Sequence, residues 1–336
     1  MELPCPAELK EEFPLSRPAK AFIAAARKTA ENILQRKDER LAAIVGPCSI
    51  HDPESACEYA GRIKKLAQEL EKSLFLVMRL FVEKPRTRLG WKGMVYDPHL
   101  DGSNDIAMGL RLSRRLFVEM AERGVPCATE LLEPLIVPYF DDLITWGLVG
   151  ARTSASQPHR QLASGLSFPV GFKNDIHGEL DVAISGIITS RLAHSHIGID
   201  PQGKIAAVKT HGNPLTHLIL RGAEQNPNYD PASVDKALRI LQSQHLEPRL
   251  IIDCSHGNSA KDHRKQRLAL ESVTLQSLEN KAIAGFMLES HLFAGKQPLG
   301  DDRSLLHYGV SITDPCIGWE ETELLLRSTS ISSVQK

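Results

Sequence analysis

The chain has 336 residues with a formal net charge of -1; 42% are hydrophobic and 24% are charged, a balance typical of a soluble globular protein rather than of a basic nucleic-acid-binding protein. No apolar run approaches the roughly 18 residues of a membrane span, the N-terminus does not read as a signal peptide, and the six cysteines form no CxxC pair. We therefore expect a cytoplasmic protein that binds neither membrane nor nucleic acid.

The first 40 residues precede any strand-like pattern. They read as a polar arm followed by a helix over Ala19–Arg36. We therefore divide the chain into an arm and helix over residues 1–40 and one catalytic domain over residues 41–336. An extra arm on a domain of this kind is usually an interface or regulatory part.

From residue 41 onward, short β-rich runs alternate with helical patterns. The expected strands are Leu41–Val45, Leu74–Leu80, Pro126–Leu132, Gly147–Ala151, Phe168–Phe172, Thr216–Leu220, Arg249–Asp253 and Ile283–Leu288. Helix-like spacing of apolar residues appears at Glu54–Leu70, Asn104–Arg123, Pro134–Trp146 and Ser233–His245. Eight buried-type strands separated mostly by helices predict an α/β fold, a (β/α)8 TIM barrel. An open doubly wound sheet is the rival, but neither GxGxxG nor GxxxxGK[ST] follows the first strand.

The connection over residues 174–215 is longer than a normal βα link. It contains a helix-like stretch at Gly178–Leu192 and then a pattern typical of a hairpin that turns at Asp200–Gly203. The predicted barrel therefore carries an N-terminal extension and a β-hairpin inserted between strands 5 and 6.

Cationic side chains gather where the expected strands end, which is where barrel enzymes place their active sites. The set comprises Arg79, Lys84, Arg86, Arg152, Lys173 and Arg221. Any one of them is more simply read as solvated or paired with a carboxylate. Six cations at one end of one barrel would repel each other without an anionic ligand, so together they predict a site for more than one anionic group, such as two phosphorylated substrates.

Four potential metal ligands also follow expected strands: Cys48, His256, Glu289 and Asp314. Thiolate, imidazole and carboxylate donors together suit one divalent transition metal, namely Mn, Fe, Co or Zn. Each residue alone has an ordinary structural reading, because a buried cysteine usually acts as a small hydrophobe. Their shared placement at strand ends is what favours a metal site.

These residues lie in blocks that resemble the type I 3-deoxy-D-arabino-heptulosonate 7-phosphate (DAHP) synthases, the aromatic amino acid-regulated class of bacteria and fungi. The most specific blocks are GPCSIHDP at Gly46–Pro53 and MRLFVEKPRTRLGWKG at Met78–Gly93. Further blocks follow in the family's order at Asp97–Ser103, Trp146–Asn174, Leu218–Gly222, Ile251–Lys261, Glu289–Leu292 and Tyr308–Thr322.

The resemblance implies condensation of phosphoenolpyruvate with erythrose 4-phosphate and water to give DAHP and phosphate, the first step of the shikimate pathway. It assigns the metal to Cys48, His256, Glu289 and Asp314. It assigns phosphoenolpyruvate to Arg79, Lys84, Arg152, Lys173 and Arg221, and the phosphate of the aldose to Arg86 and Thr87. Lys84 or a metal-bound group would handle the proton. A homodimer or homotetramer is also expected.

Feedback-inhibited relatives build a site for an aromatic amino acid from the hairpin, the N-terminal arm and a serine equivalent to Ser167. Near His196 and Gly198 such relatives tend to carry an aromatic residue and a serine, which this chain lacks. Two interpretations stay open: an altered or lost effector response, and retained inhibition through different contacts.

Two other functions compete with this reading. One is a synthase that condenses phosphoenolpyruvate with a different sugar phosphate, against which Lys84-Pro85-Arg86-Thr87 argues. The other is a barrel that has become a regulatory subunit sensing aromatic amino acids. The intact metal and cation sets argue against that alternative.

Overall fold

The computed structural model describes residues 2–86, 89–224, 226–300 and 302–334. Within them, eight parallel strands close into a barrel in the order β1-β10-β9-β8-β5-β4-β3-β2. The strands are β1 (Leu41–Gly46), β2 (Leu74–Arg79), β3 (Cys127–Glu130), β4 (Trp146–Val149), β5 (Val170–Lys173), β8 (Thr216–Leu220), β9 (Leu250–Asp253) and β10 (Ile283–Glu289). The predicted TIM barrel is confirmed.

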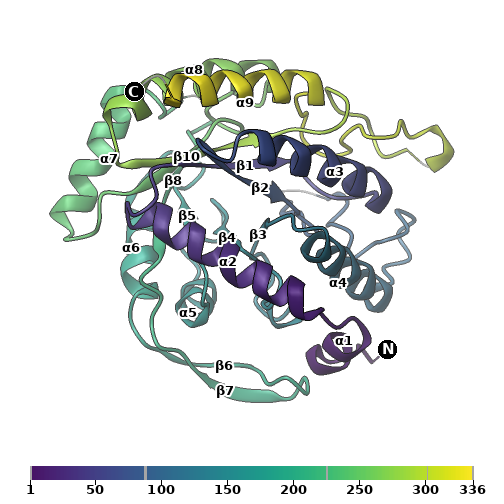
Figure 1. Ribbon diagram of the computed structural model, residues 1–336. Helices are drawn as coiled ribbons and strands as arrows, with labels where there is room; N and C mark the ends of the chain where they lie inside the picture. The colour runs from purple at the N-terminus through teal and green to yellow at the C-terminus, as the bar shows by residue number, and fades with distance from the viewer. Residues whose placement is uncertain (1, 87–88, 225, 301, 335–336) are drawn as a thin grey trace.

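Helices surround the barrel, as Figure 1 shows. Those of the main repeat are α3 (Pro53–Glu69), α4 (Ile106–Glu122), α5 (Gln157–Gly165), α6 (Asp181–Ser190), α7 (Pro231–Ser243), α8 (Gln266–Glu279) and α9 (Trp319–Val334). Short 3-10 turns lie at η1 (Val137–Tyr139), η2 (His263–Lys265) and η3 (Arg303–Leu305). No helix within the described residues is long and apolar enough to cross a membrane.

The strands are buried on both faces, which is why their sequences are nearly continuous apolar runs rather than alternating ones. One face packs against the surrounding helices in a large core. The other forms an interior cluster that includes Ile44, Trp146 and Ile251. A buried core of this kind rigidly positions the strand ends, and therefore the side chains that follow them.

The N-terminal extension forms two helices, α1 (Pro6–Glu12) and α2 (Arg17–Leu34), so the expected polar arm is partly helical. Ser16 caps α2 by accepting a hydrogen bond from the backbone N–H of Ala19. Three α2 residues, Ala30, Ile33 and Leu34, join the interior cluster. In Figure 1, α2 crosses the opening of the barrel. This helix therefore covers the end at which the strands begin.

The segment between β5 and β8 contains α6 and two antiparallel strands, β6 (Ser195–Ile199) and β7 (Ile205–Lys209). The turn of this pair contacts the N-terminal extension, because the backbone N–H of Ala7 donates to the carbonyl of Pro201 at 2.8 Å. Two segments that the barrel repeat does not require thus meet on one side of the molecule (Figure 1).

One expected helix was wrong. Residues 134–146 form turns, the 3-10 element η1 and the start of β4 instead of an α-helix. Pro138 lies at the centre of this segment and has no backbone N–H for an i to i−4 bond. The chain instead forms i to i−3 bonds, such as that from the N–H of Phe140 to the carbonyl of Val137 at 2.9 Å.

Candidate active site

A cavity of about 610 Å³ opens at the end of the barrel where the strands finish. Its wall includes every cation that the sequence singled out, namely Arg79, Lys84, Arg86, Arg152, Lys173 and Arg221. These residues come from β2, its following loop, and the ends of β4, β5 and β8. Thr87 lies outside the described residues. The closed topology, rather than closeness in sequence, brings the six cations together.

The proposed metal ligands meet at the edge of the same cavity. One ligand atom from each of Cys48, Glu289 and Asp314 lies within 4.8 Å of the other two. The fourth residue, His256, places Nε2 at 3.6 Å from Oε1 of Glu289. Cys48 and Glu289 are buried, whereas Asp314 is partly open to the cavity. All four side chains thus converge, with His256 slightly outside the compact group of three.

The imidazole of His256 is oriented by its neighbours. Nδ1 lies 2.9 Å from Oδ2 of Asp253 and 2.7 Å from the hydroxyl of Ser255. His256 also has a backbone φ of +54°, which is unusual for a residue with a side chain. Because Nδ1 is engaged by these groups, Nε2 is left directed toward Glu289. This is the arrangement by which a carboxylate usually orients a metal-binding histidine.

Lys84 lies among the same acidic groups. Its Nζ donates to Sγ of Cys48 at 2.7 Å and to Oδ2 of Asp314 at 2.8 Å. Burial disfavours the ammonium, but the charges of Cys48, Asp314 and Glu289 outweigh it and raise the pKa of Lys84. Burial also raises the pKa of the Cys48 thiol to about 12. Lys84 is therefore a fixed, protonated group beside the candidate metal ligands.

Two further buried ion pairs hold cations at the cavity floor. Nζ of Lys173 lies 2.8 Å from Oδ2 of Asp253, and Nη2 of Arg79 lies 3.0 Å from Oε1 of Glu289. Burial opposes ionisation of Asp253, yet the charges of His256 and Lys173 keep its pKa well below the usual value. Asp253 thus links a cation of the anion site to the candidate metal site.

Arg79 has one buried nitrogen, Nη1, that has no hydrogen-bond partner within the described part of the chain. Burying an unsatisfied donor of a charged group costs on the order of 1–3 kcal/mol or more. Since Arg79 also lines the cavity, an anionic ligand would satisfy this donor.

Sequence reasoning did not assign roles to Asp253, Ser255 or Glu83. Asp253 is the last residue of β9, and its position at a strand end was the signal available. Glu83 is buried next to Lys84 and accepts a hydrogen bond from the hydroxyl of Tyr96 at 3.1 Å. Burial raises the pKa of Glu83 to about 8. The sequence does not reveal that Glu83 contacts Tyr96, so it gave no reason to assign a role to Glu83.

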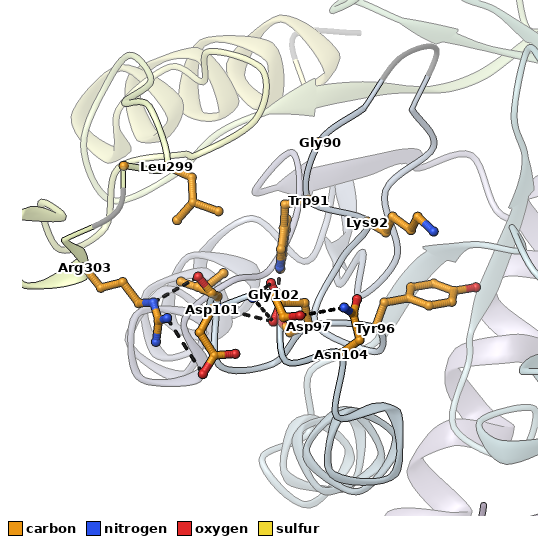
Figure 2. Close-up of a pocket in the computed structure, with 12 residues that line it drawn as sticks. Gly90, Trp91, Lys92, Tyr96, Asp97, Asp101, Gly102, Asn104, Leu299 and Arg303 are labelled. Carbon is orange, nitrogen blue, oxygen red and sulfur yellow. Dashed lines mark hydrogen bonds and ion pairs between the residues drawn. The ribbon is translucent and has the colours of Figure 1, made fainter. Parts of the chain in front are cut away.

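A second cavity of about 410 Å³ is drawn in Figure 2. Its wall includes Gly90, Trp91 and Lys92, which follow Lys84 in the same sequence motif. The indole N–H of Trp91 donates to the carbonyl of Asp97 at 2.9 Å, and Nε of Arg303 donates to the carbonyl of Leu100. The two arms of the loop are joined near its base, where the N–H of Lys84 donates to the carbonyl of Lys92 at 2.8 Å. The loop that carries Arg86 is therefore anchored on both sides.

Ser167 lies away from the cavity. It is exposed, and its hydroxyl accepts a hydrogen bond from Nη1 of Arg27 on α2 at 3.3 Å. The guanidinium of Arg27 also lies over the ring of Phe168, 4.8 Å from the centroid. The effector residue suggested by the resemblance is thus in contact with the N-terminal extension.

With this geometry established, the chain can be compared with known proteins. The model of the DAHP synthetase I family matches residues 17–327. The chain belongs to this family. A Tyr-sensitive phospho-2-dehydro-3-deoxyheptonate aldolase from Escherichia coli is 49% identical over 323 residues, which cover 96% of this chain and 90% of that protein.

Two more family relatives agree. The Phe-sensitive enzyme of Escherichia coli is 46% identical, with 97% of this chain and 93% of the relative covered. Among solved structures, a phospho-2-dehydro-3-deoxyheptonate aldolase from Francisella tularensis superposes with a TM-score of 0.97 at 40% identity, covering 99% of this chain and 97% of that chain. Family membership therefore extends over nearly the whole barrel and its N-terminal extension.

Proposed function

We propose that this member of the DAHP synthase family condenses phosphoenolpyruvate with erythrose 4-phosphate and water, releasing phosphate and DAHP, in the first step of aromatic amino acid biosynthesis. The observation that carries the proposal is the convergence of six cations with the Cys48, His256, Glu289 and Asp314 group in one cavity. The family match and the names of the relatives support the same reaction.

The donor set fits one divalent transition metal. One thiol, one imidazole and two carboxylates form a mixed soft and hard ligand group, suited to Mn, Fe, Co or Zn. The contacts of Asp253 and Ser255 with Nδ1 of His256 leave Nε2 for the metal. When bound, the metal supplies Lewis acidity that polarises the aldehyde oxygen of the sugar.

The cations at the floor of the cavity would hold phosphoenolpyruvate. Arg79, Lys173 and Arg221 are buried there, and Arg152 also lines the wall. Burial, together with the neighbouring charge of Arg152, lowers the pKa of Arg221, although Asp253 partly counteracts it. A carboxylate and a phosphate bound among these residues would relieve this crowding of positive charge.

The bond changes would follow the order that the family resemblance implies. The methylene carbon of phosphoenolpyruvate attacks the aldehyde carbon of erythrose 4-phosphate, forming the new C–C bond. Water adds to the former enol carbon, and phosphate leaves as the C–O bond breaks. Lys84 holds a proton at Nζ beside the candidate metal ligands, which suits it to protonate the oxygen that gains charge during attack. Fixing both anions in one geometry supplies much of the rate enhancement.

Arg86 would bind the phosphate end of the aldose, and the family resemblance assigns Thr87 to the same phosphate. Arg86 is exposed and lies at the rim of the cavity. A rim position suits the distal end of a short sugar whose aldehyde points toward Lys84. The cavity thus has a buried phosphoenolpyruvate end and an exposed aldose end, and the family match supports erythrose 4-phosphate as the aldose.

The proposal is tested with purified, metal-reconstituted protein. Loss of phosphoenolpyruvate and release of inorganic phosphate are followed with erythrose 4-phosphate and, separately, with arabinose 5-phosphate. Turnover with the four-carbon sugar alone is the expected result. Turnover only with arabinose 5-phosphate would retain the chemistry but reject this substrate. No turnover with either, despite bound metal, would instead favour a regulatory barrel.

We further propose that aromatic amino acids inhibit this chain weakly or not at all. The relatives include enzymes named Tyr-sensitive and Phe-sensitive. Here His196 and Gly198 occupy β6, and the hydroxyl of Ser167 is bonded to Arg27. These contacts support an altered effector site built from the same segments.

We also propose that the chain assembles into a homodimer or a homotetramer. The side chains of Ile197 and Ile205, on the two strands β6 and β7, are each 83% exposed. Their strands pair only with each other among the described residues, so this apolar face is available to a second subunit. Light scattering after size-exclusion chromatography should give a mass of two or four chains, and a monomer at micromolar concentration would reject this part.

A further inference from the structure

A separate cavity of about 360 Å³ opens at the opposite end of the barrel, where the strands begin. Residues just before β1, β8 and β9 line it, together with Arg191 after α6. This volume is within the range of small-molecule pockets. Its wall belongs neither to the candidate active site nor to the hairpin.

Three arginines line this cavity, Arg36, Arg191 and Arg249, against a single carboxylate from Glu247. Among the described residues, the hydrogen bonds of the three guanidiniums go to backbone carbonyls and one hydroxyl, and Glu247 acts on Arg191 as a nearby charge. This contrasts with arginines elsewhere on the surface, such as Arg62 with Glu58 and Arg239 with Asp235. The cavity wall therefore has excess positive charge.

Arg249 is the most constrained of the three, because only 7% of the residue is exposed. It donates to the carbonyls of Ile33, Leu34 and Lys281, so all three of its guanidinium nitrogens have carbonyl partners. Carbonyls at the end of α2 carry only about half an elementary charge between them. Burial, and secondarily the nearby charge of Arg36, lowers the pKa of Arg249 to about 10. The positive charge of Arg249 is thus fixed and incompletely compensated.

Arg36 and Arg191 have donors to spare. Arg36 donates from Nη2 to the carbonyl of Pro248 at 3.1 Å, and Arg191 donates from Nε and Nη2 to Thr216. Within the described chain, their other guanidinium nitrogens have no protein acceptor. Arg191 and Arg249 line the same cavity wall as His217. A ligand with several acceptor oxygens would match these free donors.

We propose that this cavity, defined by Arg36, Arg191 and Arg249, is a binding site for a small dianion, either inorganic phosphate or the phosphate group of a small metabolite. Phosphate offers the acceptor oxygens and double negative charge that the three arginines require. The site lies beyond the barrel's interior cluster from the catalytic cavity, and no described residue lines both cavities.

Isothermal titration of the metal-reconstituted protein with inorganic phosphate provides the test, with glycerol 3-phosphate as a parallel probe of the metabolite form. The wild type is expected to bind one phosphate per chain beyond those held in the catalytic cavity. The double variant Arg36→Ala, Arg191→Gln should lose only this additional site and keep full turnover. The variant Arg152→Ala should weaken only the phosphate binding of the catalytic cavity. The two variants therefore separate loss of phosphate binding at the new site from failure of the proposed reaction in the catalytic cavity.

The single variant Arg36→Ala provides a second test in case the double variant does not fold. Arg36 is exposed, so its replacement should leave the fold intact. It should weaken phosphate binding at the new site at least roughly tenfold, the effect of losing one charge-assisted hydrogen bond. Arg239→Ala, which removes an exposed arginine of α7, is the matched control and should leave both sites intact. Unchanged stoichiometry and affinity in both the single and the double variant would overturn the proposal.

Discussion

Arg79 and Glu289 form a buried ion pair, with Nη2 of the arginine 3.0 Å from Oε1 of the glutamate. They end β2 and β10, the two strands that flank β1 in the barrel. The pair therefore joins a residue assigned to the anion site with a residue assigned to the metal site. A change in either partner should affect both functions of the cavity.

Arg79→Lys should lower kcat/KM for phosphoenolpyruvate by about two orders of magnitude. Lysine can keep one contact with Glu289. It lacks the planar guanidinium, and therefore the second donor, Nη1, that is available to an anionic ligand. Steady-state kinetics with each substrate varied in turn measures the effect. Arg62→Lys, on the exposed surface of α3, is the control and should behave as the wild type. Wild-type kinetics in Arg79→Lys would contradict the anion assignment.

Removal of the metal should abolish turnover, and a divalent transition metal should restore it. The reason is that Cys48, His256, Glu289 and Asp314 converge as a mixed donor set for a transition metal that would polarise the aldehyde. Metal content is measured by elemental analysis beside activity. In protein loaded with Co²⁺, the sulfur-to-metal absorption band should appear in the wild type and vanish in Cys48→Ser. Substantial activity after verified metal removal would disprove metal dependence.

Arg86→Ala should raise the KM for erythrose 4-phosphate at least tenfold while leaving the KM for phosphoenolpyruvate within about twofold. This split is expected because Arg86 lies at the exposed rim, whereas Arg79, Lys173 and Arg221 lie on the buried floor. Arg303→Ala, in the wall of the neighbouring cavity, is a suitable comparison because it should change neither constant. Equal increases in both KM values would argue against separate binding positions for the aldose at the rim and phosphoenolpyruvate on the floor.

Glu83→Gln should stabilise the protein more at pH 8 than at pH 5. Burial raises the pKa of Glu83 from 4.5 to about 8, with repulsion from Glu130 and Glu133 adding to the effect. Between these values the folded state keeps the proton that the unfolded state has released, so this carboxyl destabilises folding increasingly as pH rises. Glutamine stays neutral, so its advantage should grow by up to a few kcal/mol across that interval.

Urea unfolding of metal-free protein at pH 5, 6, 7 and 8 measures this difference. Glu11→Gln, at an exposed position of α1, provides the reference variant. A stability difference for Glu83→Gln that is constant from pH 5 to pH 8 would refute a protonated Glu83.

Phe, Tyr and Trp, added separately to the activity assay, should each inhibit the wild type only weakly. The family resemblance implies an aromatic ring and a hydroxyl near the positions of His196 and Gly198 in inhibited relatives, so we expect stacking and one hydrogen bond to be missing here. Inhibition is compared at saturating and at KM concentrations of both substrates. Strong inhibition by any of the three would show that the altered segment still binds an effector.

The sequence by itself determined the barrel, because strands buried on both faces must be continuous apolar runs, and these runs recur with helices between them. It also placed the cations and the four potential ligands at strand ends. It could not specify residues 134–146, where the local apolar spacing favours a helix but Pro138 and tertiary packing impose a 3-10 turn.

Only the tertiary structure decided the contacts between residues far apart in the chain. Closing the barrel places Lys84 against Asp314, Lys173 against Asp253, and Arg249 against the end of α2. Each of these contacts depends on which strands become neighbours and how far each strand extends, and neither quantity is set by local residue preferences. The sequence therefore determined which chemical groups are available at each end of the barrel, while chain closure decided which of them touch, which remain charged, and which donors are left for a ligand.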